Sequence, residues 1–422
     1  MNPSIAGNWP RLTGRAIRTL LLALAVLVPL GDIGRLGRST HDGAEPGLTT
    51  LITVVIIGLG LAGGHCLNAV RRYPALLLLL LFITLGVFAS LGVSDDGAAV
   101  SMSIRMIGYA LVAAAVIGVG MHADDVARTV GWFALSSALV AVLSLIDYFL
   151  WLDVPVINDR LVYREIGPNS IRSVTGPFYS QTTVAANVAM ALPIALCLAL
   201  QRSVSALNRL GWAAAVFALS LVGILTYSRG LVLSSFVAGV YVLVQVTRPF
   251  RPGQLARLAA IVILAGASMR VVAPELLSAF LVRAELIRPQ HVVESEHDML
   301  RLYAAQATLS DVSRAPLGAG FTNPSITAFG EVNVHSNFTF ALRAGGALGI
   351  FFLLVFFAPL AAHALRAGAP RIELAVFASL ASFGTYGLAH TTIGFVFGWV
   401  LLGIAASVRA SASERSLSPV QG

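Results

Sequence analysis

Long apolar runs recur along almost the whole chain, and short polar segments that carry arginine separate them. About twelve of these runs are long enough, or nearly so, to cross a hydrocarbon layer of roughly 30 Å as helices. The pattern therefore predicts an all-α, polytopic membrane protein with about twelve transmembrane helices. The predicted spans lie near 14–31, 48–69, 74–93, 104–121, 129–151, 180–200, 207–227, 230–247, 255–273, 337–362, 371–388 and 391–408.

The distribution of arginine predicts the orientation of these spans. With the N-terminus in the cytoplasm, fifteen arginines fall on the inner side, whereas the short external loops hold six. This bias follows the positive-inside rule. The six external positions are Arg35, Arg38, Arg160, Arg164, Arg172 and Arg229.

The same topology places the two long connections, 152–179 and 274–336, on the external (periplasmic) side. In the larger loop, LLSAFLVRAEL (276–286) and MLRLYAAQATL (299–309) have apolar residues at helical spacing, and PLGAGF (316–321) is typical of a tight loop. We therefore expect short amphipathic helices at the membrane surface. The predicted organisation is membrane helices in 1–151, an external loop in 152–179, membrane helices in 180–273, a large external loop in 274–336, membrane helices in 337–408 and a cytoplasmic tail in 409–422.

Composition agrees with an integral membrane protein. Hydrophobic residues make up 57% of the 422 residues and charged residues 11%, and the mean hydropathy is +0.83. The net charge of +8 comes from arginines that are scattered between apolar runs, so no basic domain for nucleic acid is indicated. Cys66 and Cys197 lie far apart within apolar runs, which argues against a disulfide framework or a zinc site.

His335 is the first candidate for chemistry. It lies in VNVHSNFTF (332–340), immediately before an apolar helix whose predicted N-cap is Ser336 or Asn337. The free N–H groups and the positive dipole end of such a helix can bind phosphate or a similar anion. The alternative is an interfacial histidine that only bonds to a neighbour.

Four arginines are candidates for anion binding or for ordinary structural roles. Arg229 ends LVGILTYSRG between two spans, where it is either an anion clamp or a snorkelling side chain. Arg172 and Arg301 lie in the two external loops, where a solvated charge is the usual role. Arg343 falls one to two turns inside the span that follows His335, so it needs a partner or a wet cavity.

A metal site is the main rival chemistry. His291 and Asp298 bound the polar stretch HVVESEHD, and 94–96 forms an external acidic pair after a serine. Neither stretch has a spacing specific for a metal, and a solvated loop explains both. No phosphate-binding or dinucleotide-binding glycine motif occurs in the sequence.

Four segments, taken in order, resemble the bacterial O-antigen ligase and O-antigen polymerase superfamily. They are RSVTGPFYSQTTVAANVAMALPIAL (172–196), LTYSRG (225–230), RLYAAQATLSDVSRAPLGAGF (301–321) and VHSNFTFALRAGGALG (334–349). The resemblance covers roughly 165–355, including the large external loop.

The resemblance implies a metal-independent glycosyltransferase, without a cofactor, at the periplasmic face of the bacterial cytoplasmic (inner) membrane. Its donor is a glycan on undecaprenyl diphosphate, and its acceptor is a saccharide, either lipid A–core or a growing glycan. By matching motif, Arg229 and Arg301 bind the diphosphate, Arg172 is a further candidate for that site, and His335 is the general base. Ligase, polymerase and protein-glycosylating relative remain open, and a secondary transporter or flippase of lipid-linked glycans is the alternative class.

Overall fold

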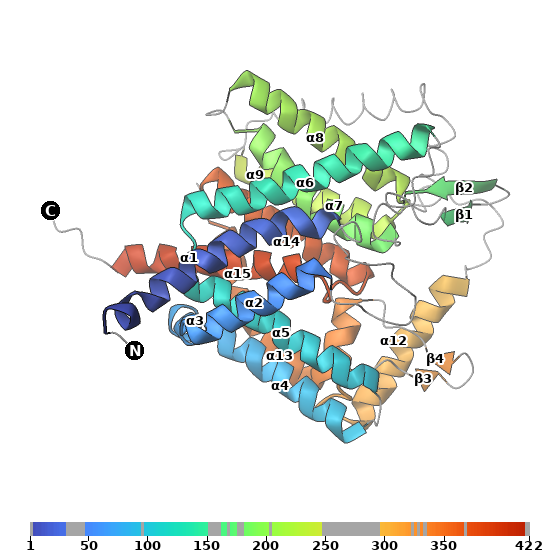
Figure 1. Ribbon diagram of the computed structural model, residues 1–422. Coiled ribbons are helices and arrows are strands. Elements are labelled where there is room, and N and C mark those ends of the chain that lie inside the picture. The colour runs from blue at the N-terminus through green and yellow to red at the C-terminus, as the bar shows by residue number, and fades with distance from the viewer. Residues whose placement is uncertain are drawn as a thin grey trace. The chain divides into compact units, whose positions relative to one another are not determined.

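The computed structural model describes residues 3–30, 47–93, 97–150, 162–166, 169–174, 181–201, 205–246, 296–321, 325–326, 330–331, 336–366 and 369–417. Helices dominate these ranges (Figure 1). Within them, nine helices are long and apolar enough to cross a membrane. The number of spans rises to ten if a bent pair of helices counts as one span. The chain is therefore a multi-pass helical membrane protein, as the apolar pattern predicts.

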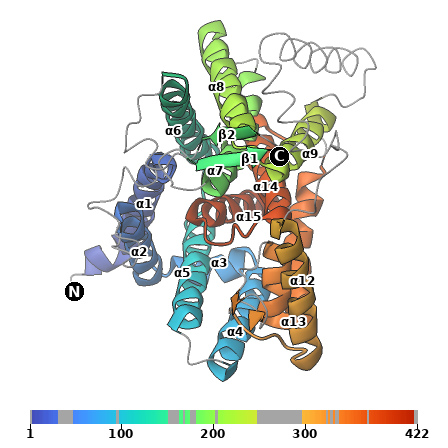
Figure 2. The same cartoon turned by 90° about the vertical axis from the view of Figure 1, so that its right-hand side faces the viewer.

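The described helices fall into two compact units. The first unit comprises Met1–Ser136, Glu294–Arg366 and Gly387–Gly422. In it α4 packs on α13, α5 contacts α3 and α15, and α12 lies beside α13 (Figure 2). Its helices are α1 (Pro3–Leu27), α2 (Leu48–Ala62), α3 (His65–Arg72), α4 (Leu76–Val93), α5 (Gly97–Val119), α12 (Glu296–Arg314), α13 (Asn337–Ala364) and α15 (Val396–Leu417), with the first half of α6 (Ala123–Leu150).

The second unit comprises Ser137–Val293 and Ala367–Tyr386. It holds the rest of α6, α7 (Gln181–Ala199), α8 (Ala206–Leu225), α9 (Arg229–Val246) and most of α14 (Arg371–Ala389). In it α7 packs on both α8 and α9. The buried Ser379 hydroxyl of α14 donates to the carbonyl of Met190 at 2.7 Å, which joins α14 to α7.

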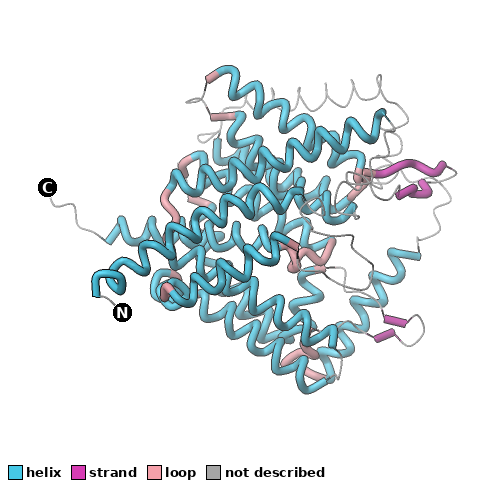
Figure 3. Tube along the Cα trace, viewed as in Figure 1, coloured by secondary structure: helices cyan, strands magenta, loops and turns pink. Residues whose placement is uncertain are grey.

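Two short hairpins accompany the helices (Figure 3). The antiparallel strands β1 (Val162–Ile166) and β2 (Asn169–Ser173) form one of them, and β3 (Ser325–Ile326) and β4 (Gly330–Glu331) form the other. Both hairpins lie within the two segments predicted as long loops. The all-α class is confirmed, and among the described residues these small strands are a feature that the sequence prediction lacked.

Nine of the twelve predicted spans coincide with single described helices that are long and apolar enough to cross a membrane. The predicted span 255–273 lies outside the described residues. The predicted span 74–93 forms the shorter apolar helix α4, and the predicted span 48–69 is not one helix. It is instead the pair α2 and α3, bent by 76°.

Two glycines make this bend possible. Gly64 has a φ of 70°, in the left-handed region that residues with a Cβ avoid. A Cβ at Gly63 would collide with the hydroxyl of Thr13 and the ring of His65. That ring is buried, and its Nε2 lies 3.1 Å from the Thr13 hydroxyl oxygen. Packing of the His65 ring against Thr13 of α1 thus stabilises the bend.

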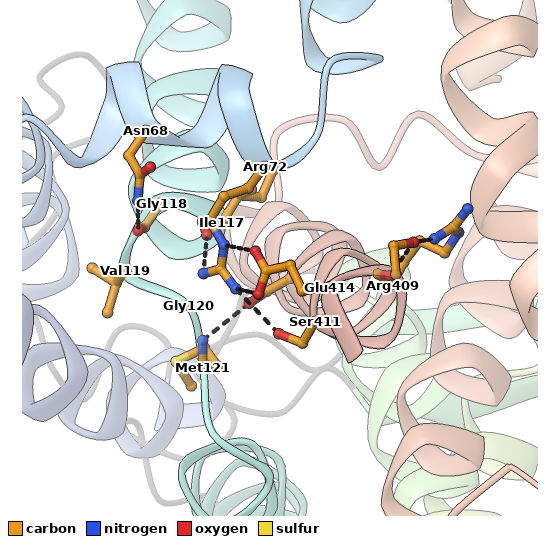
Figure 4. A network of polar contacts seen from close by, with 12 residues as sticks. Asn68, Arg72, Ile117, Gly118, Val119, Gly120, Met121, Arg409, Ser411 and Glu414 are labelled. Carbon is orange, nitrogen blue, oxygen red and sulfur yellow. Dashed lines mark hydrogen bonds and ion pairs between the residues drawn. The ribbon is translucent and has the colours of Figure 1, made fainter. Parts of the chain in front are cut away.

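Side-chain donors satisfy the carbonyls at the end of α5 (Figure 4). Arg72 Nη1 donates to Ile117 at 3.2 Å, and Asn68 Nδ2 donates to Gly118 at 2.9 Å. Arg18 Nη2 donates to Gly120 at 3.2 Å. Arg72 also pairs with Glu414 of α15, with its Nε 3.1 Å from Oε1. Cationic groups at a helix C-terminus interact favourably with its dipole, so this network is structural.

Large apolar side chains point outward from helices of both units. Phe88 of α4 is 70% exposed, and Phe236 of α9 is 68% exposed. In a multi-pass membrane protein, such faces lie against lipid.

Candidate functional site

The helix that follows His335 starts at a well-defined cap. His335 itself lies outside the described residues. Ser336 has extended backbone angles, and its hydroxyl accepts a hydrogen bond from the N–H of Thr339 at 3.1 Å. The prediction of an N-cap at this point is confirmed, with Ser336 as the capping residue.

A second contact fixes the start of α13. The side-chain amide of Asn337 donates to the hydroxyl of Thr392 at 2.8 Å and accepts from the Thr392 N–H at 2.8 Å. Thr392 is fully buried in the connection between α14 and α15. Asn337, two residues after His335, is therefore held by two hydrogen bonds to Thr392.

Arg343 has the partner that its position in a span requires. It is 6% exposed, and its Nη1 forms an ion pair with the carboxylate of Asp311 on α12. A buried charge that lost this partner would be strongly unfavourable. Sequence reasoning predicted the need for a partner but did not identify Asp311.

The glycine-containing segment 316–321 is a tight loop, as predicted. Gly318 and Gly320 have φ values of 100° and 82°. A Cβ at Gly318 would collide with the carbonyl of Ala344, and one at Gly320 would collide with the backbone of Ser90. Two glycines therefore let this loop pass close to both α13 and α4.

Hydrogen bonds and ring contacts hold the loop there. The N–H of Ala319 donates to the carbonyl of Arg343 at 2.7 Å, and the N–H of Phe321 donates to the Ser90 hydroxyl at 2.7 Å. The ring of Phe321 stacks on Phe340 and meets Phe82 edge to face, with centroid separations of 5.6 and 6.2 Å. The loop, α4 and α13 thus form one packed cluster.

Arg301 lies in the second turn of α12, and the described residues do not include its side chain. Its position shares a helical stripe with Ala304, Thr308 and Asp311, at spacings of three and four residues. Ala304 and Thr308 are buried. The predicted helix at 299–309 is confirmed, whereas the predicted helix at 276–286 lies outside the described residues.

Arg229 is the first residue of α9, in the second unit. The turn before it contains Tyr227, a buried residue with a φ of 50°. Burial and the neighbouring Tyr148 phenol raise the pKa of Tyr227 above its ordinary value. Ser228 caps α9, since its hydroxyl accepts from the N–H of Leu231 at 3.4 Å. A strained residue beside a charged helix start is a feature of functional sites that the sequence alone did not reveal.

Arg172 lies in β2 of the same unit, and the structure ties that strand to the turn before Arg229. The hydroxyl of Ser173 and the N–H of Val174 both donate to the carbonyl of Leu225, at 3.1 and 3.2 Å. Leu225 ends α8, four residues before Arg229. Arg172 and Arg229 are far apart in sequence, but their backbone positions therefore lie near each other in the second unit.

The four predicted residues divide between the units. Arg172 and Arg229 belong to the second unit, and Arg301 and His335 belong to the ranges of the first. The joining of all four into one site remains a prediction.

The described residues contain no group of three or more His, Cys, Asp or Glu side chains that could hold a metal ion. The stretch from His291 to Asp298 and the acidic pair in 94–96 have no described side chains. Cys66 and Cys197 are both free thiols.

Comparison with known proteins does not assign the chain. No protein-family model matches it, and no curated protein sequence matches it.

Proposed function

We propose that the chain is a membrane glycosyltransferase that moves a glycan from an undecaprenyl-diphosphate carrier to a saccharide acceptor. The observation that carries this proposal is Arg229 at the first position of α9, with the strand that contains Arg172 tied to the same turn. A cation at the positive end of a helix dipole is unfavourable, whereas an anion bound there interacts well with both the helix and the guanidinium. A diphosphate fits because planar guanidinium groups pair with its oxygens through two parallel hydrogen bonds.

The proposed reaction is a displacement at the anomeric carbon of the donor. An acceptor hydroxyl forms the new C–O bond while the bond from that carbon to the diphosphate oxygen breaks, and the diphosphate leaves with the electron pair. Arg229 and Arg301, with Arg172, stabilise the charge that develops on the leaving diphosphate, and each contact contributes on the order of 3 kcal/mol. His335, as neutral imidazole, accepts the proton of the hydroxyl.

The start of α13 supports the role of His335. The Ser336 cap and the paired contacts between Asn337 and Thr392 fix the backbone directly after the histidine. A general base must stay within hydrogen-bond reach of the proton that it removes, so a fixed backbone favours catalysis.

We place the reaction at the periplasmic face of the bacterial inner membrane, in a chain of about twelve spans with both long loops outside. Fifteen arginines on the inner side support this orientation. Reporter fusions within 152–179 and 274–336 test it, because both fusions must report an external location. A cytoplasmic location for either one would contradict the topology.

Transfer assays on purified lipid-linked glycan test the function. We expect His335→Ala and Arg229→Ala to lose transfer while they insert normally. His122→Ala and Arg209→Ala, which change exposed residues outside the proposed site, are the matched controls and should keep it. Full activity in both site variants would overturn the proposed site.

The glycan profile of a deletion strain distinguishes the acceptor classes. Full-length polymer that stays on its lipid carrier indicates a ligase, whereas single repeat units indicate a polymerase. Unchanged polysaccharide with altered glycoproteins would indicate a protein-glycosylating relative.

The 76° bend between α2 and α3 is the observation that favours transport as a second candidate. Secondary transporters use interrupted helices at their substrate sites. Here Thr13 and the ring of His65 fill the interruption. Flux of lipid-linked glycan across liposomes without acceptor sugar would support transport over transfer.

A further inference from the structure

The first nine residues of α13, 337–345, form a separate segment that we call the lead segment. Gly346 ends it, because its φ of 62° and ψ of −159° interrupt the helix. The lead segment directly follows His335 and Ser336. In the chain, the lead segment is thus the nearest described helix to His335.

Both ends of the lead segment are held by polar contacts. At its start, Asn337 binds Thr392 through two hydrogen bonds. Near its end, the Arg343 side chain pairs with Asp311 while the Arg343 carbonyl accepts from the N–H of Ala319. Arg343 is buried, and the Asp311 side chain is 31% exposed.

The ion pair is a polar link between the lead segment and α12. Asp311 lies ten residues after Arg301 on the same stripe of α12, which corresponds to about 15 Å along the helix. Arg343 lies eight residues after His335. The pair thus joins the helix that contains Arg301 to the segment that follows His335 in the chain.

A charged pair is suited to fixing a register. The hydrophobic effect is non-directional, so apolar burial specifies a register less strictly than a charge pair does. A slip between α12 and the lead segment would leave the buried guanidinium of Arg343 without its carboxylate, which is strongly unfavourable. The observed placement of α12 and the lead segment keeps Asp311 and Arg343 paired.

We propose that Asp311 and Arg343 are positioning residues for glycosyl transfer: their ion pair sets the register between α12, which carries Arg301, and the lead segment, which follows His335. This inference rests on the function proposed above for Arg301 and His335. Neither Asp311 nor Arg343 touches the reacting atoms. They act by keeping Arg301, which binds the diphosphate, at a constant distance from His335, the general base.

Kinetics of four variants test the inference. We expect Asp311→Asn and Arg343→Gln each to lower kcat for transfer at least tenfold at a temperature well below unfolding. The double variant Asp311→Arg with Arg343→Asp restores the pair in reverse and should recover a substantial part of kcat. Glu414→Gln breaks the Arg72–Glu414 ion pair elsewhere in the same unit and is the control, with kcat unchanged.

A distance measurement tests the register without reference to activity. Nitroxide labels at Gln306→Cys and Phe338→Cys, both exposed positions, report the separation of α12 from the lead segment in a background with Cys66→Ser and Cys197→Ser. We expect Asp311→Asn to broaden or shift the distance distribution and the reversed pair to restore it. The control Glu414→Gln should leave the distribution unchanged.

The outcomes separate the two proposals. An unchanged distance distribution in Asp311→Asn, or equal kcat in the single and reversed variants, would overturn the positioning role while the transfer function stands. A wild-type protein that inserts but transfers no glycan would overturn the proposed function, and the distances would still show whether the pair sets the register.

Discussion

Asn337 and Thr392 exchange two hydrogen bonds of 2.8 Å, which join the first residue of α13 to the connection before α15. Thr392 is fully buried, so these bonds satisfy polar groups that water cannot reach. The two residues are 55 positions apart in sequence. The contact fixes the start of the helix that follows His335 against a distant part of the same unit.

Asn337→Ala should therefore both destabilise the protein and slow transfer. The variant leaves the buried N–H of Thr392 without its acceptor, at a cost of about 1–3 kcal/mol. Thermal unfolding in detergent measures this loss, and kcat measures the effect on the site. Thr392→Ser keeps the hydroxyl and the backbone N–H, so it should show less than half of the loss in stability and less than half of the loss in kcat. Wild-type stability in Asn337→Ala would show that the contact does not hold the helix start.

Gly346→Ala should be among the most damaging single substitutions in the first unit. The backbone of Gly346 lies in a region that is accessible essentially to glycine alone, and a Cβ there would collide with the carbonyl of Pro316. Strain and overpacking together predict a loss of more than about 3 kcal/mol in unfolding free energy.

Gly108→Ala is the matched control for this substitution. Gly108 lies within α5, and the nearest atom to an added Cβ is Ile57 Cδ1 at 3.7 Å, an ordinary contact. Alanine favours a helix interior over glycine by roughly 0.5–1 kcal/mol. We expect a slightly higher Tm, and equal effects of the two substitutions would contradict a special backbone at Gly346.

Hydropathy was sufficient to predict the helices but not their interruptions. A run of about twenty apolar residues has one stable arrangement in lipid, so α7, α8 and α9 fall within a few residues of their predicted bounds. The pattern carries no information on backbone dihedral angles, however. The bend at Gly63 and Gly64 and the kink at Gly346 were therefore missed.

In the candidate site, too, the sequence predicted the local features but not the long-range contacts. The Ser336 cap and the tight loop at 316–321 depend on neighbouring residues and were predicted. Arg343 was recognised as a charge that needs a partner, but Asp311 lies 32 residues away on another helix. A local sequence pattern does not show which acidic residue is brought next to a buried guanidinium when the helices pack.

The stability of the protein should fall as pH rises above about 10, in part because of Tyr227. Burial raises the pKa of this phenol in the folded state, so between the unfolded and folded values the folded protein binds more protons than the unfolded protein. The stabilisation is complete below the unfolded pKa and is lost as pH increases toward the folded pKa. Tyr227→Phe has no proton to lose and should flatten this decline. Denaturant unfolding between pH 8 and 11 measures it, and parallel curves for the two proteins would contradict a titrating Tyr227.

Removal of divalent metal should leave glycan transfer unchanged. In the proposed reaction, guanidinium groups neutralise the leaving diphosphate, which is the role that a metal ion has in many other phosphate-processing enzymes. Transfer rates in excess chelator should match those in magnesium. Loss of activity with chelator, followed by recovery on adding magnesium, would instead favour a metal site and direct attention to the stretch from His291 to Asp298.

Arg229 should respond differently to neutralisation and to replacement by lysine. Arg229→Gln removes the charge and should lower kcat/KM by about 10²–10³-fold, as expected for one lost contact to a developing anion. Arg229→Lys keeps the charge but loses the planar fork, so we expect a loss of roughly tenfold. Inorganic pyrophosphate should inhibit the wild-type protein by competing with the donor, and it should inhibit Arg229→Gln less. Arg209→Gln, at an exposed position in the first turn of α8, is the control and should keep both the rate and the inhibition. If Arg229→Gln were inhibited as strongly as the wild type, the start of α9 would not be the diphosphate site.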